Sequence, residues 1–355
     1  MKKILALILA LTLVFALAAC AGDDTPSTSD EPKSSDNVDS KDKILIGWSG
    51  MFLDEQQTRL MSGGQGFVDA NSDKYDLYYV SADNSTEKQL SDVENLIAMG
   101  CKAIIIDEID PICSSACVTL CHEKGVLACA ASPNLTEAPD FEFVIDAELL
   151  GEAQGQAVEA WWERNSGVKL KAGYILGTTS QQQTWDTKEG GYKACFQARI
   201  DAGDLEILAE DTADWLTADA VTLVENWLLA YPEMNCIIAQ NDDMALGAVQ
   251  AAKAAGKKLG EDFFIFGKDG SETGRAALAN GEIAASVYLG FEGWGYTEVK
   301  MLCENVEKAL ATENYAYGQK IGIVLDPETC WQPILPDTVD DVIAYFDGLA
   351  EATMK

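Results

Sequence analysis

Two polar side chains stand directly after short apolar runs, where they could bind a ligand. Ile237–Ala239 is an apolar run of strand length, and Asn241 follows it at the start of a helical pattern. Phe263–Phe266 is a second such run, and Asp269 follows it in the turn GKDGS. Ligands of open α/β sheets lie beyond the carboxyl ends of the strands. We therefore expect Asn241 and Asp269 to form a polar rim around one ligand, although Asn241 alone reads more readily as a helix cap.

The same two blocks resemble a known family. AQNDDMALGAVQAAKAAGK and IFGKDGSETGRAALANGEIAASV are similar to the sugar-type substrate-binding proteins of ABC transporters, the ribose- and galactose-binding group. The resemblance is specific in these blocks and looser between Lys43 and Asp326. It implies the type I periplasmic-binding fold, in which two α/β lobes close around a ligand by a hinge motion.

The resemblance also implies the ligand contacts. Asn241 and Asp269 match contact positions of the family directly. Asp107, at the strand end IIIDEIDP, stands where the family has a polar contact, and Trp215, in EDTADWLTADA, stands where an aromatic ring stacks on the sugar. Lys188, in QQQTWDTKEGGY, takes the position of an Arg that clamps ring oxygens or hydroxyl groups, but it lacks the planar fork of Arg.

Three positions depart from the family pattern. CAASPN places Ala131 and Ser132 where the family has an Asp-Arg pair, and ASVYLG places Leu289 where it has Gln. The first loop reads GMFLDEQQ in place of an Asn-Pro-aromatic motif, which leaves as candidate contacts Phe52, Glu55 and Gln56. The first-lobe half of the site is therefore altered. We expect a pentose or hexose, with a modified sugar, a polyol or an autoinducer-like furanosyl compound as alternatives.

The chain contains eight Trp residues, and each could stack on a sugar or pack in a core. The helical positions of Trp161, Trp162 and Trp227 favour core packing. Trp185 lies near a loop, where stacking and packing are equally compatible with the pattern. We therefore add Trp185 to the candidate site.

Residues 1–19 read as a signal peptide. Lys2 and Lys3 precede an apolar run, and LAAC ends at Cys20. This junction resembles the bacterial lipobox, which implies cleavage before Cys20 and lipidation of its thiol. The alternative is an uncleaved anchor helix, but the apolar run is short for a membrane span. Residues 20–42 are rich in Ser, Asp and Pro and read as a disordered tether.

Strand and helix patterns alternate from Lys43 onward, which predicts parallel sheets with helices on both faces. The expected fold class is α/β, with two doubly wound, mainly parallel lobes joined by hinge strands. We assign residues 43–145 and 290–320 to the first lobe and residues 146–289 and 321–355 to the second.

Composition and motifs exclude several functions. The 355 residues carry a formal net charge of -33, which argues against nucleic acid as a partner. The sequence contains a single His and no G-x-S-x-G motif, so it shows no pattern typical of nucleophilic catalysis. It also contains no phosphate-binding loop, so it shows no pattern typical of nucleotide binding. We expect a monomer that is not an enzyme and needs no cofactor, although the abundant carboxylates keep a glycosidase as the weakest alternative.

The cysteines offer one candidate metal site. Cys113, Cys117 and Cys121 are four residues apart and would share one helix face, with His122 next to them. Three thiols on one helix that faces a sheet make a poor tetrahedral cage, whereas Cys often serves as a small buried hydrophobe. We therefore expect structural thiols and no metal.

Together these features predict an extracytoplasmic lipoprotein on the outer face of a bacterial cell membrane. It would bind a small carbohydrate-like solute and deliver it to the transmembrane subunits of an ABC permease. The alternative is a sensory protein that presents the same ligand to a chemoreceptor or histidine kinase.

Overall fold

A computed structural model describes residues 43–130, 135–144, 146–324 and 331–344. Cys20, Ala131, Ser132 and Cys330 lie outside these ranges, so the predictions for residues 1–42 and for the Ala131–Ser132 departure concern residues that the structure does not describe. Within the described ranges, no helix is both long and apolar enough to cross a bilayer.

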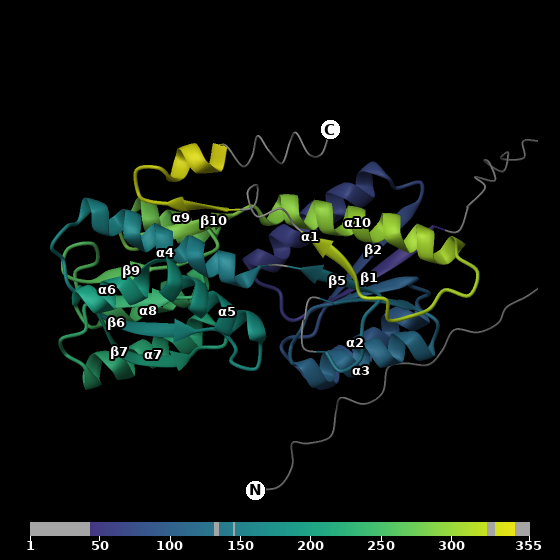
Figure 1. Ribbon diagram of the computed structural model, residues 1–355, viewed down its shortest axis with the longest axis horizontal. Coiled ribbons are helices and arrows are strands. Elements are labelled where there is room, and N and C mark those ends of the chain that lie inside the picture. Colours follow the sequence, from purple (N-terminus) through teal and green to yellow (C-terminus); the bar gives the residue numbers. More distant parts are fainter. Residues whose placement is uncertain (1–42, 131–134, 145, 325–330, 345–355) are drawn as a thin grey trace, which may run out of the picture. The chain divides into compact units, whose positions relative to one another are not determined.

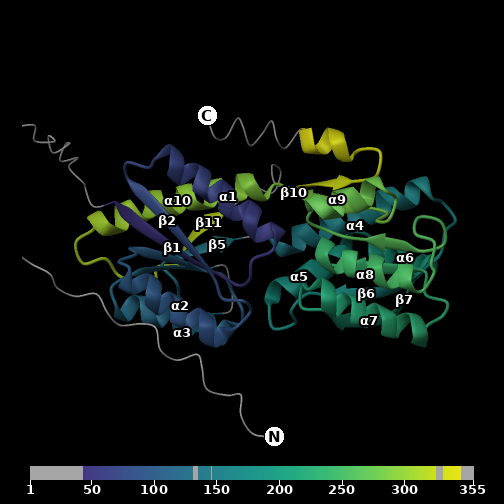
Figure 2. The same cartoon turned by 180° about the vertical axis from the view of Figure 1, so that it is seen from behind.

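The first lobe is built on a six-stranded sheet, in which all neighbouring strands run parallel. Its spatial order is β11 (Ile321–Val324), β5 (Phe141–Val144), β4 (Leu127–Ala130), β3 (Ala103–Ile106), β1 (Ile44–Gly50) and β2 (Tyr75–Ser81). Figures 1 and 2 show α1 (Glu55–Ala70) and α10 (Phe291–Ala311) on one face, and α2 (Thr86–Ala98) and α3 (Pro111–Glu123) on the other. This is the doubly wound arrangement that the alternating pattern predicts.

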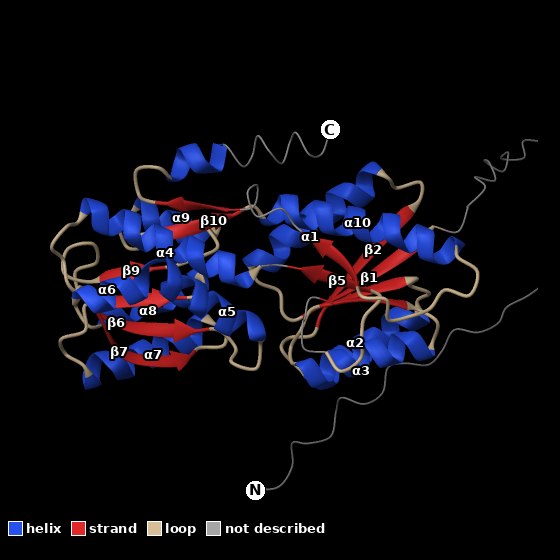
Figure 3. Cartoon of the chain, viewed as in Figure 1, coloured by secondary structure: helices blue, strands red, loops and turns tan. Residues whose placement is uncertain are grey.

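The second lobe is built on a four-stranded parallel sheet with the order β7 (Leu205–Thr212), β6 (Leu170–Leu176), β8 (Cys236–Ala239) and β9 (Phe264–Phe266). Beside it, β10 (Ser286–Leu289) pairs antiparallel with β12 (Trp331–Ile334). The helices of this lobe include α4 (Ala147–Arg164), α5 (Gln182–Gly191), α6 (Gln197–Ala202), α7 (Thr217–Ala230), α8 (Asp242–Ala254) and α9 (Glu272–Ala279). The strands and helices of both lobes are distinguished in Figure 3.

Side chains that alternate along each strand enter separate cores, because successive residues of a strand point to opposite faces. Ile238 and Phe266 join Trp161 of α4 on one face of the second sheet. Ile237 and Ile265 join Ala248 of α8 on the other. The predicted α/β fold class with two doubly wound lobes is confirmed.

One prediction about local structure is wrong. Residues 321–324 were assigned to the second lobe, but β11 pairs with β5 of the first sheet. The two strands are far apart in the sequence, so local periodicity could not identify this pairing. The helical segment after β6 consists of α5, a π-helical turn (Tyr192–Phe196) and α6 in direct succession.

Two glycines allow α1 and α10 to pack closely. A methyl group on Gly63 would lie 1.8 Å from the carbonyl oxygen of Glu292, and one on Gly295 would lie 1.8 Å from the carbonyl oxygen of Leu60. At the same contact, the guanidinium of Arg59 binds the carboxylate of Glu292, with Nε and Oε1 2.7 Å apart. This close packing fixes the part of α10 that reaches the ligand cavity.

The thiols of Cys113, Cys117 and Cys121 are buried where α3 packs on the first sheet. In the part of the chain that the structure describes, no group of three or more His, Cys, Asp or Glu side chains is arranged to hold a metal ion. The buried thiols contribute apolar packing to this core.

Candidate ligand-binding site

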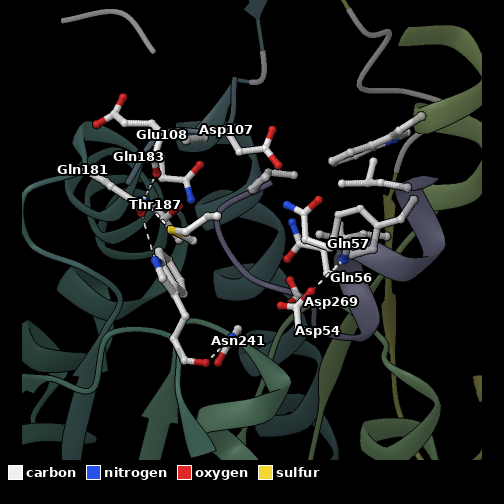
Figure 4. Close-up of a pocket in the computed structure, with 18 of the residues that line it drawn as sticks. Asp54, Gln56, Gln57, Asp107, Glu108, Gln181, Gln183, Thr187, Asn241 and Asp269 are labelled. Carbon is white, nitrogen blue, oxygen red and sulfur yellow. Dashed lines mark hydrogen bonds between the residues drawn. The ribbon is translucent and has the colours of Figure 1, made fainter. Parts of the chain in front are cut away.

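A cavity of about 160 Å³ lies at the carboxyl ends of strands from both parallel sheets. This volume is more than ten times the roughly 10–15 Å³ needed by one water molecule. The cavity can therefore hold a small organic solute. Its wall combines aromatic rings, side-chain amides and carboxylic groups from both lobes, and Figure 4 shows Asp54 and Asp269 on one side and Gln181 and Thr187 on the other.

Six of the nine predicted contact residues line this cavity: Phe52, Gln56, Asp107, Trp215, Asn241 and Asp269. Four follow four different strands, Phe52 lies in the loop before α1, and Gln56 lies in the first turn of α1. Residues far apart in the sequence are therefore brought together as the strand-end rule predicts.

Three predicted residues are absent from the cavity wall. Lys188 turns away from it and pairs with Glu210, with Nζ and Oε1 2.5 Å apart. Its neighbour Thr187 faces the cavity instead, because adjacent helix residues point in different directions. Trp185 is 41% exposed and donates its ring N–H to the carbonyl oxygen of Thr179 at 3.0 Å.

Glu55 is the third. It lies in a small neighbouring hollow, where its carboxylate accepts a hydrogen bond from the backbone N–H of Glu272. Leu289, which stands where the resemblance implies Gln, does line the cavity. It adds an apolar surface where the family has an amide.

Trp215 is held in place from three directions. Its ring N–H donates to Oε1 of Gln181 at 2.9 Å, and its main-chain carbonyl accepts from Nδ2 of Asn241 at 3.2 Å. The ring lies so close to Gly177 that a methyl group there would be 2.0 Å from it. The backbone of Trp215 has a φ of 67°, an uncommon left-handed conformation for such a large residue. These contacts fix the ring as part of the cavity wall.

Asn241 serves as a helix cap and as a cavity residue at once. Its Oδ1 accepts the N–H of Met244 at 2.8 Å, which caps α8, while its Nδ2 holds Trp215. The capping interpretation and the binding interpretation are therefore compatible. Each uses a different atom of the same amide.

Asp107 follows β3 and is bound by an aromatic donor. The ring N–H of Trp48 donates to its Oδ2 at 3.1 Å. Burial raises the pKa of Asp107 to about 7, and the hydrogen bonds from Trp48 and Gln57 oppose this shift. Near neutral pH this carboxyl group can therefore act as donor or as acceptor.

Asp269 forms a buried ion pair with Lys268, with Oδ1 and Nζ 3.2 Å apart. Burial raises the pKa of Asp269, and the adjacent Lys268 opposes the shift. Its φ of 120° lies in the region that favours glycine. Such backbone strain is common at binding sites, where the surrounding structure holds it in place.

Asp54 precedes α1 and caps it, since its Oδ1 accepts the N–H of Gln57 at 2.7 Å. Burial raises the pKa of Asp54 to about 7, and the negative charges of Asp243 and Asp269 add to the effect. The loop before α1 thus supplies a polar group that differs from the Glu55 predicted from the sequence.

Two polar atoms of the wall have no protein hydrogen-bond partner within the described residues. One is the ring nitrogen of Trp294, a residue that is 5% exposed, and the other is Oε1 of Gln57. A buried polar group without a partner costs about 1–3 kcal/mol. A polar ligand that reached them would supply the missing partners, an acceptor for the ring nitrogen of Trp294 and a donor for Oε1 of Gln57.

Several cavity residues were missed from the sequence: Trp48, Asp54, Gln57, Gln181, Lys268, Trp294 and Glu298. Asp54 and Gln181 carried a signal, because each polar group directly precedes a helix that follows a strand. Trp48 and Trp294 carried a weaker signal, because they lie near predicted strand ends or loops, where a ring can stack on a sugar. Glu298 carried none, because it lies within a long helix, where only tertiary packing decides which face meets a cavity.

Comparison with known proteins agrees with this arrangement. A family model described as the periplasmic binding protein domain matches residues 52–309. The xylitol-binding protein of Mycolicibacterium smegmatis is 28% identical over an alignment that covers 100% of this chain and 94% of that protein. The ribose import binding protein of Bacillus subtilis is 27% identical, with coverages of 81% and 88%.

A solved structure also shares the fold. It is an ABC transporter solute-binding protein from Bacillus halodurans with bound myo-inositol, and it has a TM-score of 0.68 and 22% identity. The alignment covers 85% of this chain and 98% of that one. The family match, the two doubly wound lobes and the cavity at their strand ends lead to one conclusion: this chain belongs to the periplasmic binding protein family, with the type I fold.

Proposed function

We propose that this protein captures a carbohydrate or a sugar-like polyol in the cavity between its lobes and delivers it to an ABC permease. The observation that carries the proposal is the cavity wall itself. It combines the fixed ring of Trp215 with polar atoms on Trp294 and Gln57 that have no hydrogen-bond partner among the described residues. Aromatic rings bind the apolar faces of sugars, and hydroxyl groups both donate and accept hydrogen bonds.

The named ligands of relatives support this chemistry. Xylitol, ribose and myo-inositol, named for three similar proteins, are all small polyhydroxylated molecules. The acidic wall also disfavours anionic solutes, because a buried negative charge next to a carboxylate is strongly destabilised. A neutral or cationic polyol therefore fits the site best.

Import is favoured over sensing because the ribose relative is named as an import binding protein and the myo-inositol structure as an ABC transporter component. The proposed role is non-catalytic, so the solute should be recovered unchanged after binding. We propose a monomer that works outside the cytoplasm. We assign the first lobe to residues 43–145 and 290–324, and the second to the remainder of residues 146–344.

We also propose that residues 1–19 are removed as a signal peptide and that residues 20–42 tether the folded part to a lipid on Cys20. The LAAC junction and the polar composition of the following segment support this. Cys20→Ser should release the protein into the medium or leave an unprocessed precursor. An unlipidated native protein that retains Met1, detected by mass spectrometry, would refute the anchor.

A thermal-shift screen against monosaccharides, furanoses, cyclitols and linear polyols tests the binding role. A solute that binds only the folded state raises the melting temperature as its concentration increases. We expect at least one polyol to do so, and we expect sugar acids and sugar phosphates to have no effect. Hydrolysis or isomerisation of the bound solute, measured by chromatography, would contradict the non-catalytic role.

A further inference from the structure

The cavity wall contains five carboxylic side chains and a single amine. The amine, Lys268, is already paired with Asp269. The nearby guanidinium of Arg59 is paired with Glu292 outside the cavity wall. The internal segments that are not described, residues 131–134, 145 and 325–330, contain no Lys, Arg or His. Neither Lys268, nor Arg59, nor the internal segments that are not described therefore provide a positive charge to pair with Asp107 or Glu298.

Glu298 is the least supported of these carboxylic groups. It lies on α10, is 8% exposed, and receives no hydrogen bond or ion pair from the described residues. Burial raises its pKa, and the nearby negative charge of Asp107 raises it further. A buried carboxylate without a partner is costly, so the site is stabilised either by a proton or by a cation that arrives from outside.

The adjacent wall provides a second observation that points to a ligand. Trp294, one turn before Glu298 on the same helix, has a buried ring nitrogen without a hydrogen-bond partner. The rings of Trp294 and Phe291 line the same cavity. Aromatic faces attract cations through their quadrupole, and more strongly where water is excluded. Carboxylic groups next to aromatic rings form a suitable environment for an ammonium group.

We propose that the solute is an amine-bearing sugar or cyclitol, whose ammonium group is held by Asp107 and Glu298. This inference rests on the proposed function and specifies its substrate class. The ammonium supplies both the missing positive charge and three N–H donors, while the remaining hydroxyl groups meet the amide side chains of the opposite wall. A neutral polyol would instead require Glu298 to stay protonated.

Titration calorimetry with matched pairs tests the inference. The probes are D-glucose with D-glucosamine, D-galactose with D-galactosamine, and myo-inositol with its monoamino derivative. In at least one pair the amine should bind about tenfold tighter or better, because hydrogen bonds to charged groups are worth about 1.5–3 kcal/mol. Equal or weaker binding of every amine, with measurable binding of a neutral partner, would overturn the inference and leave the proposed function intact.

Variants connect the preference to the proposed residues. Glu298→Gln and Asp107→Asn should each reduce the preference for the amine over its neutral partner to within about threefold, whatever the change in the absolute affinities. Glu304→Gln, an exposed change on the same helix, is the matched control and should keep the full preference. Circular dichroism shows whether each variant is folded. Because two variants are made, the test still works if one of them fails to fold. An undiminished preference in both folded variants would overturn the assignment, and no binding of any probe would overturn the proposed function as well.

Discussion

The side-chain amide of Asn241 donates a hydrogen bond to the main-chain carbonyl of Trp215, with nitrogen and oxygen 3.2 Å apart. The carbonyl oxygen of the same amide caps α8 by accepting the N–H of Met244. One residue therefore stabilises a helix of the second lobe and holds the aromatic wall of the cavity. The two tasks use different atoms, so they can be separated by mutation.

Asn241→Asp retains an acceptor for the cap but removes the donor to Trp215. We expect the solute affinity to fall about tenfold in Asn241→Asp and in Asn241→Ala, because both leave the buried carbonyl of Trp215 without its donor. Only Asn241→Ala should also lose the cap of α8, so the amide hydrogen of Met244 should exchange faster in Asn241→Ala than in Asn241→Asp. Titration calorimetry and amide hydrogen exchange measure the two effects. Equally fast exchange at Met244 in both variants would contradict the division of tasks.

Gln181 and Lys188 distinguish the observed cavity from the one predicted by resemblance. Gln181 accepts from Trp215 and donates to the carbonyl oxygen of Glu108 at 2.7 Å. Gln181→Ala should weaken solute binding about tenfold, because it leaves the buried ring N–H of Trp215 without a partner.

Lys188→Ala is the comparison on the same helix. It removes the pair with Glu210 and the contacts of the amine with the rings of Trp185 and Tyr192, all of which lie outside the cavity wall, so the affinity should stay within about twofold. Titration of both variants with one solute decides the matter. A larger loss in Lys188→Ala than in Gln181→Ala would restore Lys188 as a ligand contact.

The buried carboxyl groups should make the free protein less stable as the pH rises. Burial raises the pKa of Asp54, Asp107 and Asp242 to about 7 and that of Asp243 to about 6. The folded state therefore binds protons that the unfolded chain releases near pH 4, and stability is lost between about pH 4 and pH 7. The raised pKa of His122 adds to the same trend.

Urea unfolding of the ligand-free protein at pH 5.5 and pH 8 measures this effect. We expect the free energy of unfolding to be lower at pH 8 by more than about 1 kcal/mol, since one unit of pKa shift corresponds to about 1.4 kcal/mol. Asp107→Asn should reduce the difference. Stability that rises from pH 5.5 to pH 8 would show that these groups are ionised in the folded protein.

The thiols of α3 should matter for packing and not for binding. Cys117 is fully buried against the first sheet. Cys117→Ala should lower the free energy of unfolding by about 1–2 kcal/mol and leave solute affinity unchanged. Elemental analysis of protein purified without added metal is the second measurement. Stoichiometric zinc or iron that disappears in Cys117→Ala would refute the structural role.

Sequence analysis correctly predicted those cavity residues whose position depends only on the order and direction of the strands. Asn241, Asp107 and Asp269 follow β8, β3 and β9, and the carboxyl ends of parallel strands meet at one edge whatever the details of packing. For such residues, recognising a strand is enough to place the side chain at the site.

The predictions failed where the position of a residue depends on how a helix is rotated or on which strand a strand pairs with. Lys188 and Thr187 are adjacent on α5, and the packing of that helix determines that Thr187 faces the cavity. In the sequence, Glu298 looks like a solvent-exposed charge on an amphipathic helix. In the structure, the packing of α10 buries it in the cavity wall. The place of β11 depends on β5, a strand that is distant in sequence. No local pattern carries this information.

Titration calorimetry of the wild-type protein and of Asp269→Asn with the solute found in the thermal screen tests the binding role most directly. Asn keeps the shape of Asp269 and an acceptor for Lys268, so the fold should survive, as circular dichroism can verify. We predict one solute per wild-type chain and an affinity about tenfold lower in Asp269→Asn, because a charged acceptor is lost. Unchanged affinity in a folded Asp269→Asn variant, or no polyol binding by the wild-type protein, would contradict a sugar-like ligand in this cavity.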